Sequence, residues 1–318
     1  MLTPEMFGAV GDGVTDDYPA LAAMFLSVGT ADGGIKHTPS VFSFSAGSTY
    51  YCSQVPTIKQ ANCKVYGNFA CIKGAAGGLA VKGGTAHALA PYISDLMIQG
   101  GSGDGLYLYN APQAVLERVL VKSLTDSGSS CSGTGIHVAA SVAVKIQDCE
   151  IDHPGAFGIN VETALATNGV PAESQDTWIS GCRVYFSGQS GIRVSEGGGH
   201  YISDNNIEGC NRGISVDASF SFYAEGNYLE SNGTDFYTDN AAAYISGRYI
   251  QCGLIRANDS NSRPNSIIIQ AGNGIVIRHN RLCGAVYIEP AATNTVYDRE
   301  LMLVGTYSNG SSSTVVKT

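Results

Sequence analysis

ISGCRVY at residues 179–185, ISDNNIE at residues 202–208 and AEGNYLE at residues 224–230 are three copies of one pattern. Each copy has an apolar residue, two polar or small residues, a turn-like position, and then two or three alternating residues. Further copies begin at Ile93, Leu116, Ile146, Ile245 and Ile277. Successive copies start 21–33 residues apart, and a second alternating segment follows most of them, as in GIRVS from Gly191 and GISVD from Gly213.

The repeat length decides between the architectures that short strands can build. Two strands per repeat without an intervening helix exclude βαβ units, and a propeller blade needs about 40 residues. In a chain that winds in coils, both alternating segments of each repeat can pair as strands with their counterparts in the next repeat. The pattern therefore predicts an all-β fold, a single-stranded right-handed parallel β-helix. Asn205 and Asn227 share the turn position of neighbouring copies, so we expect their side chains to hydrogen-bond along the axis.

The composition agrees with such a fold and excludes several functions. The 318 residues include 40 glycines, and 14% of them are charged, against about 25% in an average domain. With a net charge of −9 and no cluster of Lys and Arg, we expect no nucleic-acid partner. No run of 18 apolar residues and no signal-peptide pattern occur, so we expect no membrane insertion.

Nine cysteines are present without a CxxC pair, and we interpret most of them as small buried residues of a reduced chain. No spacing of His, Cys and carboxylates is typical of a metal site. The sequence therefore predicts neither a metal nor another cofactor.

FGAVGDGVTDD at residues 7–17 precedes YPALAAMF, whose apolar stripe predicts a helix that covers the open end of the solenoid. This motif and the degenerate coils after it resemble the pectate-lyase-type β-helix superfamily, and most closely its bacteriophage tailspike and depolymerase proteins. The resemblance implies a homotrimer that binds, and usually cleaves, a bacterial surface polysaccharide. It also implies a place in the virion tail after synthesis in the host cytoplasm, and it transfers no catalytic residue.

We divide the chain into three parts on these grounds. Residues 1–30 hold the motif and the capping helix, residues 31–290 the β-helix, and residues 291–318 a C-terminal strand and tail.

Outward residues of neighbouring coils stack about 4.8 Å apart, so the repeats can be read as columns. One column contains Asp152, Tyr185, Glu208 and Glu230, an acidic line with one aromatic residue. Glycoside hydrolysis uses two carboxyl groups, about 5–5.5 Å apart in retaining enzymes and about 6.5–9.5 Å apart in inverting ones. Adjacent coils suit the first distance and coils two apart suit the second. We therefore predict that Glu208, Glu230 and Asp152 are the catalytic residues.

Sugars need aromatic platforms and many polar partners, and both lie in these columns. The expected substrate-binding residues are Tyr185, Arg183, Asn206, Tyr228, Tyr249 and Arg193. A rival groove on the second strand contains Glu162, Asp217 and Asp239 with Arg193, beside the loop at residues 163–177.

Two alternatives stay open. A polysaccharide lyase on the same fold would cleave by β-elimination and use Arg183, Tyr185 and Arg193. A non-catalytic β-helix would hold a glycan without cutting it. Acidic ladders on a solenoid also serve solubility and prevent edge aggregation, so an acidic column does not require catalysis.

Overall fold

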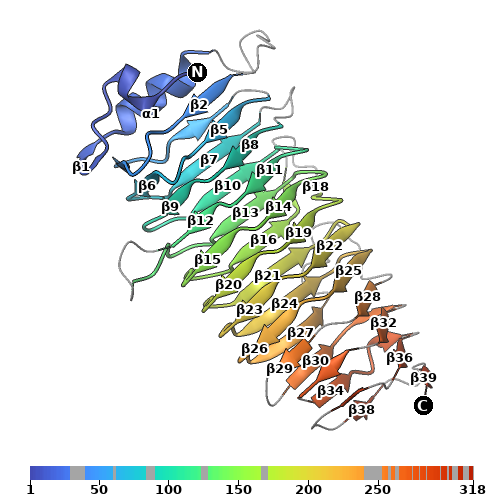
Figure 1. The fold of residues 1–318 in the computed structure, drawn as a ribbon. Coiled ribbons are helices and arrows are strands. Elements are labelled where there is room, and N and C mark those ends of the chain that lie inside the picture. Colours follow the sequence, from blue (N-terminus) through green and yellow to red (C-terminus); the bar gives the residue numbers. More distant parts are fainter. Residues whose placement is uncertain are drawn as a thin grey trace.

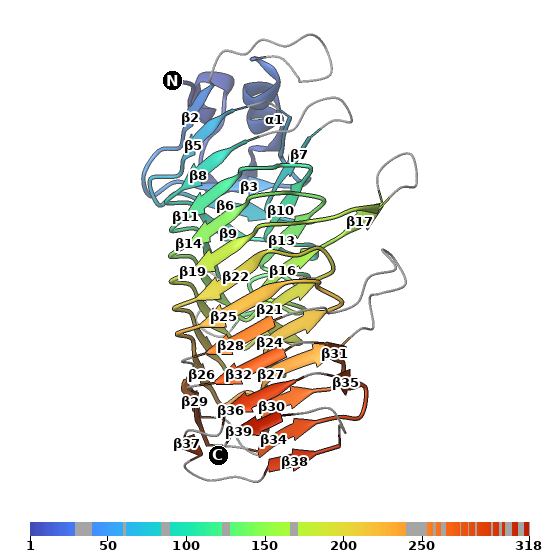
Figure 2. The same ribbon diagram turned by 90° about the vertical axis from the view of Figure 1, so that its right-hand side faces the viewer.

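Three parallel sheets form the sides of a stack of coils in the computed structural model (Figures 1 and 2). The structure describes residues 1–28, 40–59, 62–83, 90–122, 128–165, 171–239, 253–256, 259–261, 265–273, 275–278, 280–283, 285–293, 295–298, 301–302, 307–310 and 315–317. Each strand pairs in parallel with its counterpart one coil earlier and one coil later. The predicted right-handed parallel β-helix is confirmed.

Sheet A has 12 strands in the described residues. They are β2 (Val41–Ser43), β5 (Lys64–Tyr66), β8 (Tyr92–Ser94), β11 (Val115–Glu117), β14 (Lys145–Gln147), β19 (Trp178–Ser180), β22 (His200–Ser203), β25 (Phe222–Glu225), β28 (Gly253–Arg256), β32 (Ile275–Arg278), β36 (Val296–Asp298) and β39 (Val315–Lys317).

Sheet B also has 12 described strands, and it follows sheet A within each coil. They are β1 (Asp12–Asp16), β3 (Thr49–Cys52), β6 (Cys71–Gly74), β9 (Met97–Gln99), β12 (Leu120–Val121), β15 (Glu150–Asp152), β20 (Arg183–Tyr185), β23 (Asn206–Glu208), β26 (Tyr228–Glu230), β29 (Asp259–Asn261), β33 (Arg281–Leu282) and β37 (Leu301–Met302).

Sheet C has 11 described strands and closes each coil. They are β4 (Thr57–Ile58), β7 (Leu79–Lys82), β10 (Leu106–Tyr109), β13 (Ile136–Ala139), β16 (Ile159–Glu162), β21 (Ser190–Ser195), β24 (Arg212–Asp217), β27 (Thr234–Asp239), β30 (Asn265–Ile269), β34 (Ala285–Ile288) and β38 (Tyr307–Asn309). Two small pairs lie outside the coils: antiparallel β17 (Ala164–Leu165) with β18 (Pro171–Ala172), and parallel β31 (Gly272–Asn273) with β35 (Ala292–Thr293).

The coil has three strands where the sequence pattern predicts two. Residues 202–208 do not form one strand, because Asp204 has a φ of 56° and turns the chain between sheets A and B. Gly226 takes the same position in the next coil, with a φ of 68°. A left-handed residue bends the chain and ends the strand, and Gly and Asp tolerate this conformation better than most residues. Each copy therefore supplies one corner and two short strands.

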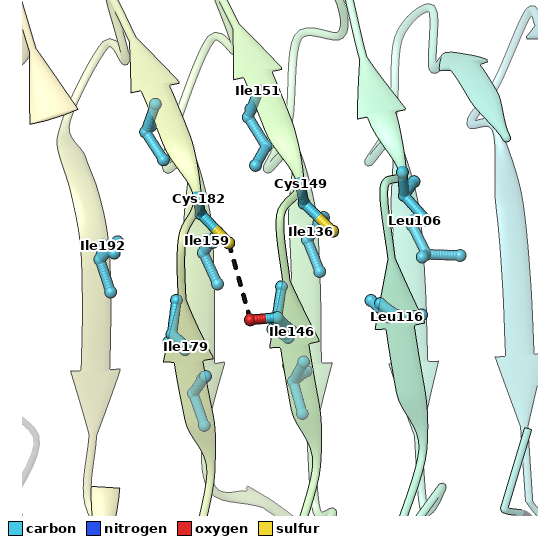
Figure 3. Packing of buried hydrophobic residues seen from close by; sticks show 14 of the residues in the cluster. Leu106, Leu116, Ile136, Ile146, Cys149, Ile151, Ile159, Ile179, Cys182 and Ile192 are labelled. Carbon is cyan, nitrogen blue, oxygen red and sulfur yellow. Dashed lines mark hydrogen bonds between the residues drawn. The ribbon is translucent and has the colours of Figure 1, made fainter. Parts of the chain in front are cut away.

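The interior is a column of aliphatic side chains whose members are fully buried (Figure 3). Cysteines fit into the same column: Cys182 Sγ lies 3.6 Å from the carbonyl oxygen of Ile146. Seven of the eight described cysteines are buried and all eight are free, as the composition predicts.

Asparagines form the expected ladder at the corner between sheets A and B. The side-chain amide of Asn205 donates to the side-chain oxygen of Asn227 at 2.9 Å and to the Ile179 carbonyl at 3.0 Å. The backbone N–H of Cys182 donates to the side-chain oxygen of Asn205 at 2.9 Å. Each asparagine thus satisfies buried backbone groups of the neighbouring coil, which a purely apolar corner would leave unpaired.

The helix α1 (Tyr18–Leu26) covers the N-terminal end of the coils after a short 3₁₀ turn, η1 (Pro4–Phe7) (Figure 1). Its apolar side chains belong to the core, and Phe25 meets Phe42 edge-on at 5.0 Å. Asp17 precedes the helix and turns back to accept hydrogen bonds from the backbone of Val10 and Gly11. The glycine-rich motif therefore folds around one buried carboxylate and fixes the cap on the first coil.

All three sheets continue past residue 290, through β36, β37, β38 and β39. The division of the chain at residue 290 stays a prediction. Within the described residues, no helix is long and apolar enough to cross a membrane.

Candidate functional site

The predicted acidic column exists on the outer face of sheet B. Asp152 pairs with Tyr185, Tyr185 with Glu208, and Glu208 with Glu230. These four residues therefore occupy equivalent positions on four successive coils, each partly exposed. Neighbouring strands lie about 4.8 Å apart. Glu208 and Glu230 are direct neighbours, whereas Tyr185 lies between Asp152 and Glu208.

The three carboxylates have different surroundings. Asp152 Oδ1 lies 2.7 Å from Nδ1 of His153, and Glu230 Oε2 accepts a hydrogen bond of 2.7 Å from the Tyr228 hydroxyl. The Glu208 carboxylate makes no hydrogen bond or ion pair with the residues that the structure describes. Within this column, Glu208 is thus the carboxylate open to a ligand.

An aromatic ridge borders this column at the corner between sheets B and C. His153 and Phe186 both have a positive φ, which directs their side chains outward from the corner. Their rings stack with centroids 4.6 Å apart, and the Phe186 ring is 6.5 Å from that of Tyr185. Phe186 is 48% exposed. Its ring lies over Gly209, where a Cβ would come within 2.4 Å of it.

Sequence reasoning missed this ridge because it followed strand positions. The signal was present, since an aromatic residue directly follows the strand in two successive copies, His153 after Asp152 and Phe186 after Tyr185. Exposed rings beside carboxylates are the surface that a sugar ring needs. We name this ridge together with Asp152, Tyr185, Glu208 and Glu230 the sheet B site.

The second predicted column runs along the other edge of the same strands. Arg183 pairs with Asn206, and Asn206 with Tyr228. Arg183 borders a cleft of about 340 Å³ at the corner between sheets A and B, and its guanidinium lies 3.9 Å from Glu150. This column therefore shares the outer face of sheet B with the acidic column but lies at the end of the strands farther from the aromatic ridge, and the Tyr228 hydroxyl reaches across to Glu230.

The strand that follows β26 in sheet B is not the one that the sequence pattern predicts. Tyr228 pairs with Asp259 of β29, so β29 occupies the place that the copy beginning at Ile245 was expected to take. Tyr249 itself lies outside the described residues. Period-two alternation matched two segments of this long repeat, and alternation alone did not identify the one that pairs.

A cleft of about 520 Å³ on sheet C includes Arg193 and Asp217 of the rival groove. It is lined by Phe157, Gln189, Ser190, Arg193, Asn211, Arg212, Ser215 and Asp217. We name it the sheet C cleft. Its columns follow the predicted register, with Arg193 paired to Ser215 and Ser195 paired to Asp217. The side chain of Asp239, also expected here, lies outside the described residues.

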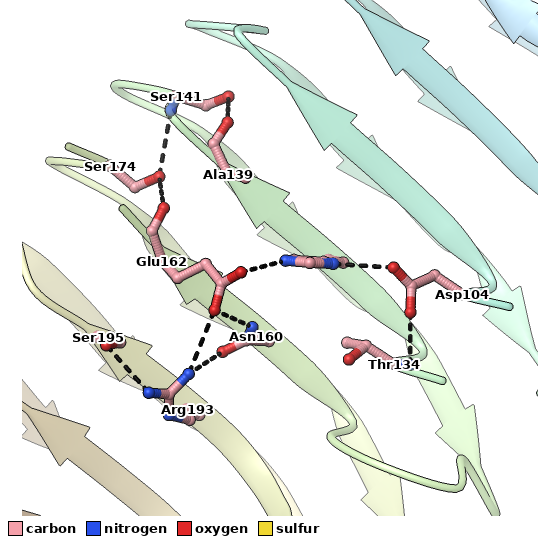
Figure 4. A network of polar contacts seen from close by, with 10 residues as sticks. Asp104, Thr134, Ala139, Ser141, Asn160, Glu162, Ser174, Arg193 and Ser195 are labelled. Atoms are coloured by element: carbon pink, nitrogen blue, oxygen red, sulfur yellow. Dashed lines mark hydrogen bonds and ion pairs between the residues drawn. The ribbon is translucent and has the colours of Figure 1, made fainter. Parts of the chain in front are cut away.

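Ion pairs connect the coils beside this cleft. Arg193 Nε lies 2.7 Å from Asp217. Its Nη1 lies 3.3 Å from Glu162 (Figure 4). His137 lies between two acids, with Nδ1 2.8 Å from Asp104 and Nε2 2.9 Å from Glu162. An ionised carboxylate only accepts, so with both acids ionised both ring nitrogens donate and His137 carries a positive charge.

The pKa values follow from this arrangement. Burial alone would lower the pKa of His137, but its hydrogen bonds with Asp104 and Glu162 prevail and raise it to about 9. Burial alone would raise the pKa of Glu162, but His137, Asn160 and Arg193 lower it to about 2. Glu162 is therefore ionised at neutral pH and cannot act as a general acid. The network is suited to holding coils together rather than to proton transfer.

Comparisons with known proteins agree with the fold. Residues 92–248 match the family model described as periplasmic copper-binding protein (NosD). Across the described ranges, no three His, Cys, Asp or Glu side chains gather as a metal site. No curated protein matches the chain in sequence.

Three solved structures share the architecture at low sequence identity. The Dettilon tailspike protein is 14% identical with a TM-score of 0.64, over 97% of this chain and 68% of its own. The catalytic unit of the GH87 α-1,3-glucanase from Streptomyces thermodiastaticus is 12% identical with a TM-score of 0.55, over 98% and 69%. The Streptococcus pneumoniae surface protein and adhesin PfbA is 12% identical with a TM-score of 0.51, over 99% of each chain. The chain is thus a right-handed parallel β-helix protein, with an architecture that occurs in a tailspike, a glycanase and an adhesin.

Proposed function

We propose that the chain binds a polysaccharide of the bacterial surface at the sheet B site and hydrolyses it. The observation that carries the proposal is the direct pairing of Glu208 and Glu230 on adjacent coils beside exposed aromatic rings. Strand spacing of about 4.8 Å matches the carboxyl separation of about 5–5.5 Å that retaining glycosidases use.

The surroundings of the two glutamates suggest their roles. The Tyr228 hydroxyl orients one oxygen of Glu230, so we assign Glu230 as the nucleophile that attacks the anomeric carbon. We assign Glu208 as the general acid that protonates the departing glycosidic oxygen. Glu208 then takes a proton from water, and this water releases the sugar from Glu230. Asp152 is the alternative partner of Glu208, two coils away, and that pair would invert the anomeric configuration.

The rings of Tyr185 and Phe186 would hold sugar faces next to these carboxylates. Phe186 is exposed, and aromatic faces bind the apolar side of pyranose rings through burial of apolar surface. The proposal includes the homotrimer and the place in a virion tail that the resemblance to tailspikes implies.

Tyr185 argues against the lyase alternative. A β-elimination needs a base to remove a proton from the sugar, and a tyrosine that serves as this base must lose its own proton first. Burial raises the pKa of Tyr185 above its ordinary value near 10, so its hydroxyl stays protonated at neutral pH. Arg193 is already paired with two carboxylates.

The test is digestion of a panel of purified capsules and O-antigens, following new reducing ends and near-ultraviolet absorbance together. New reducing ends without absorbance support hydrolysis. Absorbance that rises with the reducing ends identifies an unsaturated sugar and a lyase. Binding of a glycan without either signal identifies a non-catalytic binder and overturns the proposal.

A further inference from the structure

We infer that the sheet C cleft binds an acidic sugar unit, and that Arg212 pairs with the carboxylate of this unit. This inference rests on the proposed function and deepens it, because it makes the polysaccharide an acidic one. It concerns a different face from the two glutamates, so each can be tested without the other.

The two arginines of the cleft differ in their partners. Arg193 is neutralised by Asp217 at 2.7 Å and approaches Glu162. The guanidinium of Arg212 lies over the ring of Tyr237, 3.6 Å from its centroid, and forms no ion pair with any carboxylate of the described residues. The lining therefore holds two cations and one anion, and the uncompensated charge is that of Arg212.

The stacking on Tyr237 prepares Arg212 for a ligand. A cation over a tyrosine face is attracted by about 0.5–2 kcal/mol, which holds the guanidinium in one plane. The N–H groups at the edge of this plane stay available, and their fork matches the two oxygens of a carboxylate.

Neutral groups around Arg212 suit the hydroxyls of a sugar. The Gln189 side chain makes no hydrogen bond with the described residues and is exposed at the rim. Asn211 donates its amide to the Gly188 carbonyl at 2.6 Å, which leaves its side-chain oxygen to accept. Phe157 forms an apolar wall, against which Arg193 lies at 5.2 Å.

The cleft lies across one corner from the sheet B site. Only Gly209, Cys210 and Asn211 separate Glu208, the last residue of β23, from Arg212, the first of β24. A polysaccharide that crosses this corner would meet the carboxylate pair and the arginine with neighbouring units.

Saturation-transfer NMR with free D-glucuronate tests the inference, with D-glucuronamide as its neutral counterpart. We expect transfer to glucuronate in the wild type, several-fold weaker transfer to glucuronamide, and at least a fivefold loss for glucuronate in Arg212→Gln. Arg212→Lys keeps the charge without the fork and should lose part of the signal. Arg118→Gln is the matched control, because Arg118 is exposed, already paired with Asp95, and lies on another corner.

Two results would overturn the inference. One is the absence of transfer from glucuronate to the folded wild type, and the other is an equal signal in Arg212→Gln. Circular dichroism of each variant checks that it has folded. If glucuronate fails while a neutral polysaccharide is still hydrolysed, the acidic subsite is wrong and the proposed function stands. If glucuronate binds and no polysaccharide is hydrolysed, the acidic subsite stands and the proposed function is wrong.

Discussion

Sheets B and C both bring charged side chains of successive coils close together, but the charges are alike on sheet B and opposite on sheet C. On sheet B, Glu208 and Glu230 meet as like charges on adjacent coils, with no cation between them in the register. On sheet C, Arg193 is in register with Asn160 and Ser215, and its side chain reaches diagonally to Glu162 of the preceding coil and to Asp217 of the following one. Because a parallel solenoid places equivalent residues in one line, acids at one position repel each other unless a cation of a neighbouring column pairs with them. The outer face of sheet B, where the two glutamates repel each other, is the one suited to a ligand.

The largest expected effect is on catalysis at the sheet B site. Glu230→Gln should lower turnover by about 10³-fold, because the covalent intermediate cannot form on an amide. Proton NMR of the first product should show retention of the anomeric configuration in the wild type. Glu225→Gln changes a carboxylate of the same coil on sheet A and should leave turnover unchanged. Full turnover in Glu230→Gln, together with inversion in the wild type, would move the pair to Glu208 and Asp152.

Substitutions in the ion-pair network of sheet C should have their largest effect on stability. His137→Gln removes the cation that joins Asp104 and Glu162, and we expect the free energy of unfolding to fall by about 2–3 kcal/mol. Urea unfolding followed by circular dichroism measures this loss. Turnover per folded molecule should stay the same. A stability within 0.5 kcal/mol of wild type, about the scatter of ordinary surface substitutions, would show that the network does not hold the coils.

A smaller effect on the sheet B face separates orientation from chemistry. Tyr228→Phe removes the hydroxyl that donates to Glu230 and should lower kcat by about tenfold, the equivalent of 1.4 kcal/mol. KM should change little, because the ring remains. A large rise in KM with constant kcat would make Tyr228 a binding residue instead.

The smallest expected effect is the pH dependence of the sheet C network. The pKa of His137 is raised to about 9, so its stabilisation is complete below pH 6.5 and is lost as the pH rises through 9. The pKa of Glu162 is lowered to about 2, so its stabilisation is complete above pH 4.5 and is lost as the pH falls through 2.

We therefore expect the wild type to be less stable at pH 9.5 than at pH 6, with a smaller loss in His137→Gln. Urea midpoints at the two pH values measure both losses. Equal losses in the two proteins would assign the alkaline destabilisation to other groups.

The sequence correctly predicted the strand register and the outward columns, which depend on period-two alternation. A slip of one residue would turn every side chain of a strand to the other face, so the pairing of Tyr185, Glu208 and Glu230 followed from the pattern alone. Corners are not governed by alternation. The third sheet, created by the left-handed Asp204, and the exposed Phe186 were therefore missed.

Long-range partners were equally hidden from the sequence. The ion pair of His137 with Glu162 spans 25 residues and depends on how two side chains lean across the coils. The long repeat near Tyr249 offered two alternating segments, and only pairing decided between them.

The most direct test of the central claim is to measure binding and turnover of Glu208→Gln on one polysaccharide that the wild type cleaves. We predict a dissociation constant within a few-fold of wild type and a loss of new reducing ends of about 10³-fold. Unchanged turnover in this variant would contradict the account and remove the catalytic site from sheet B.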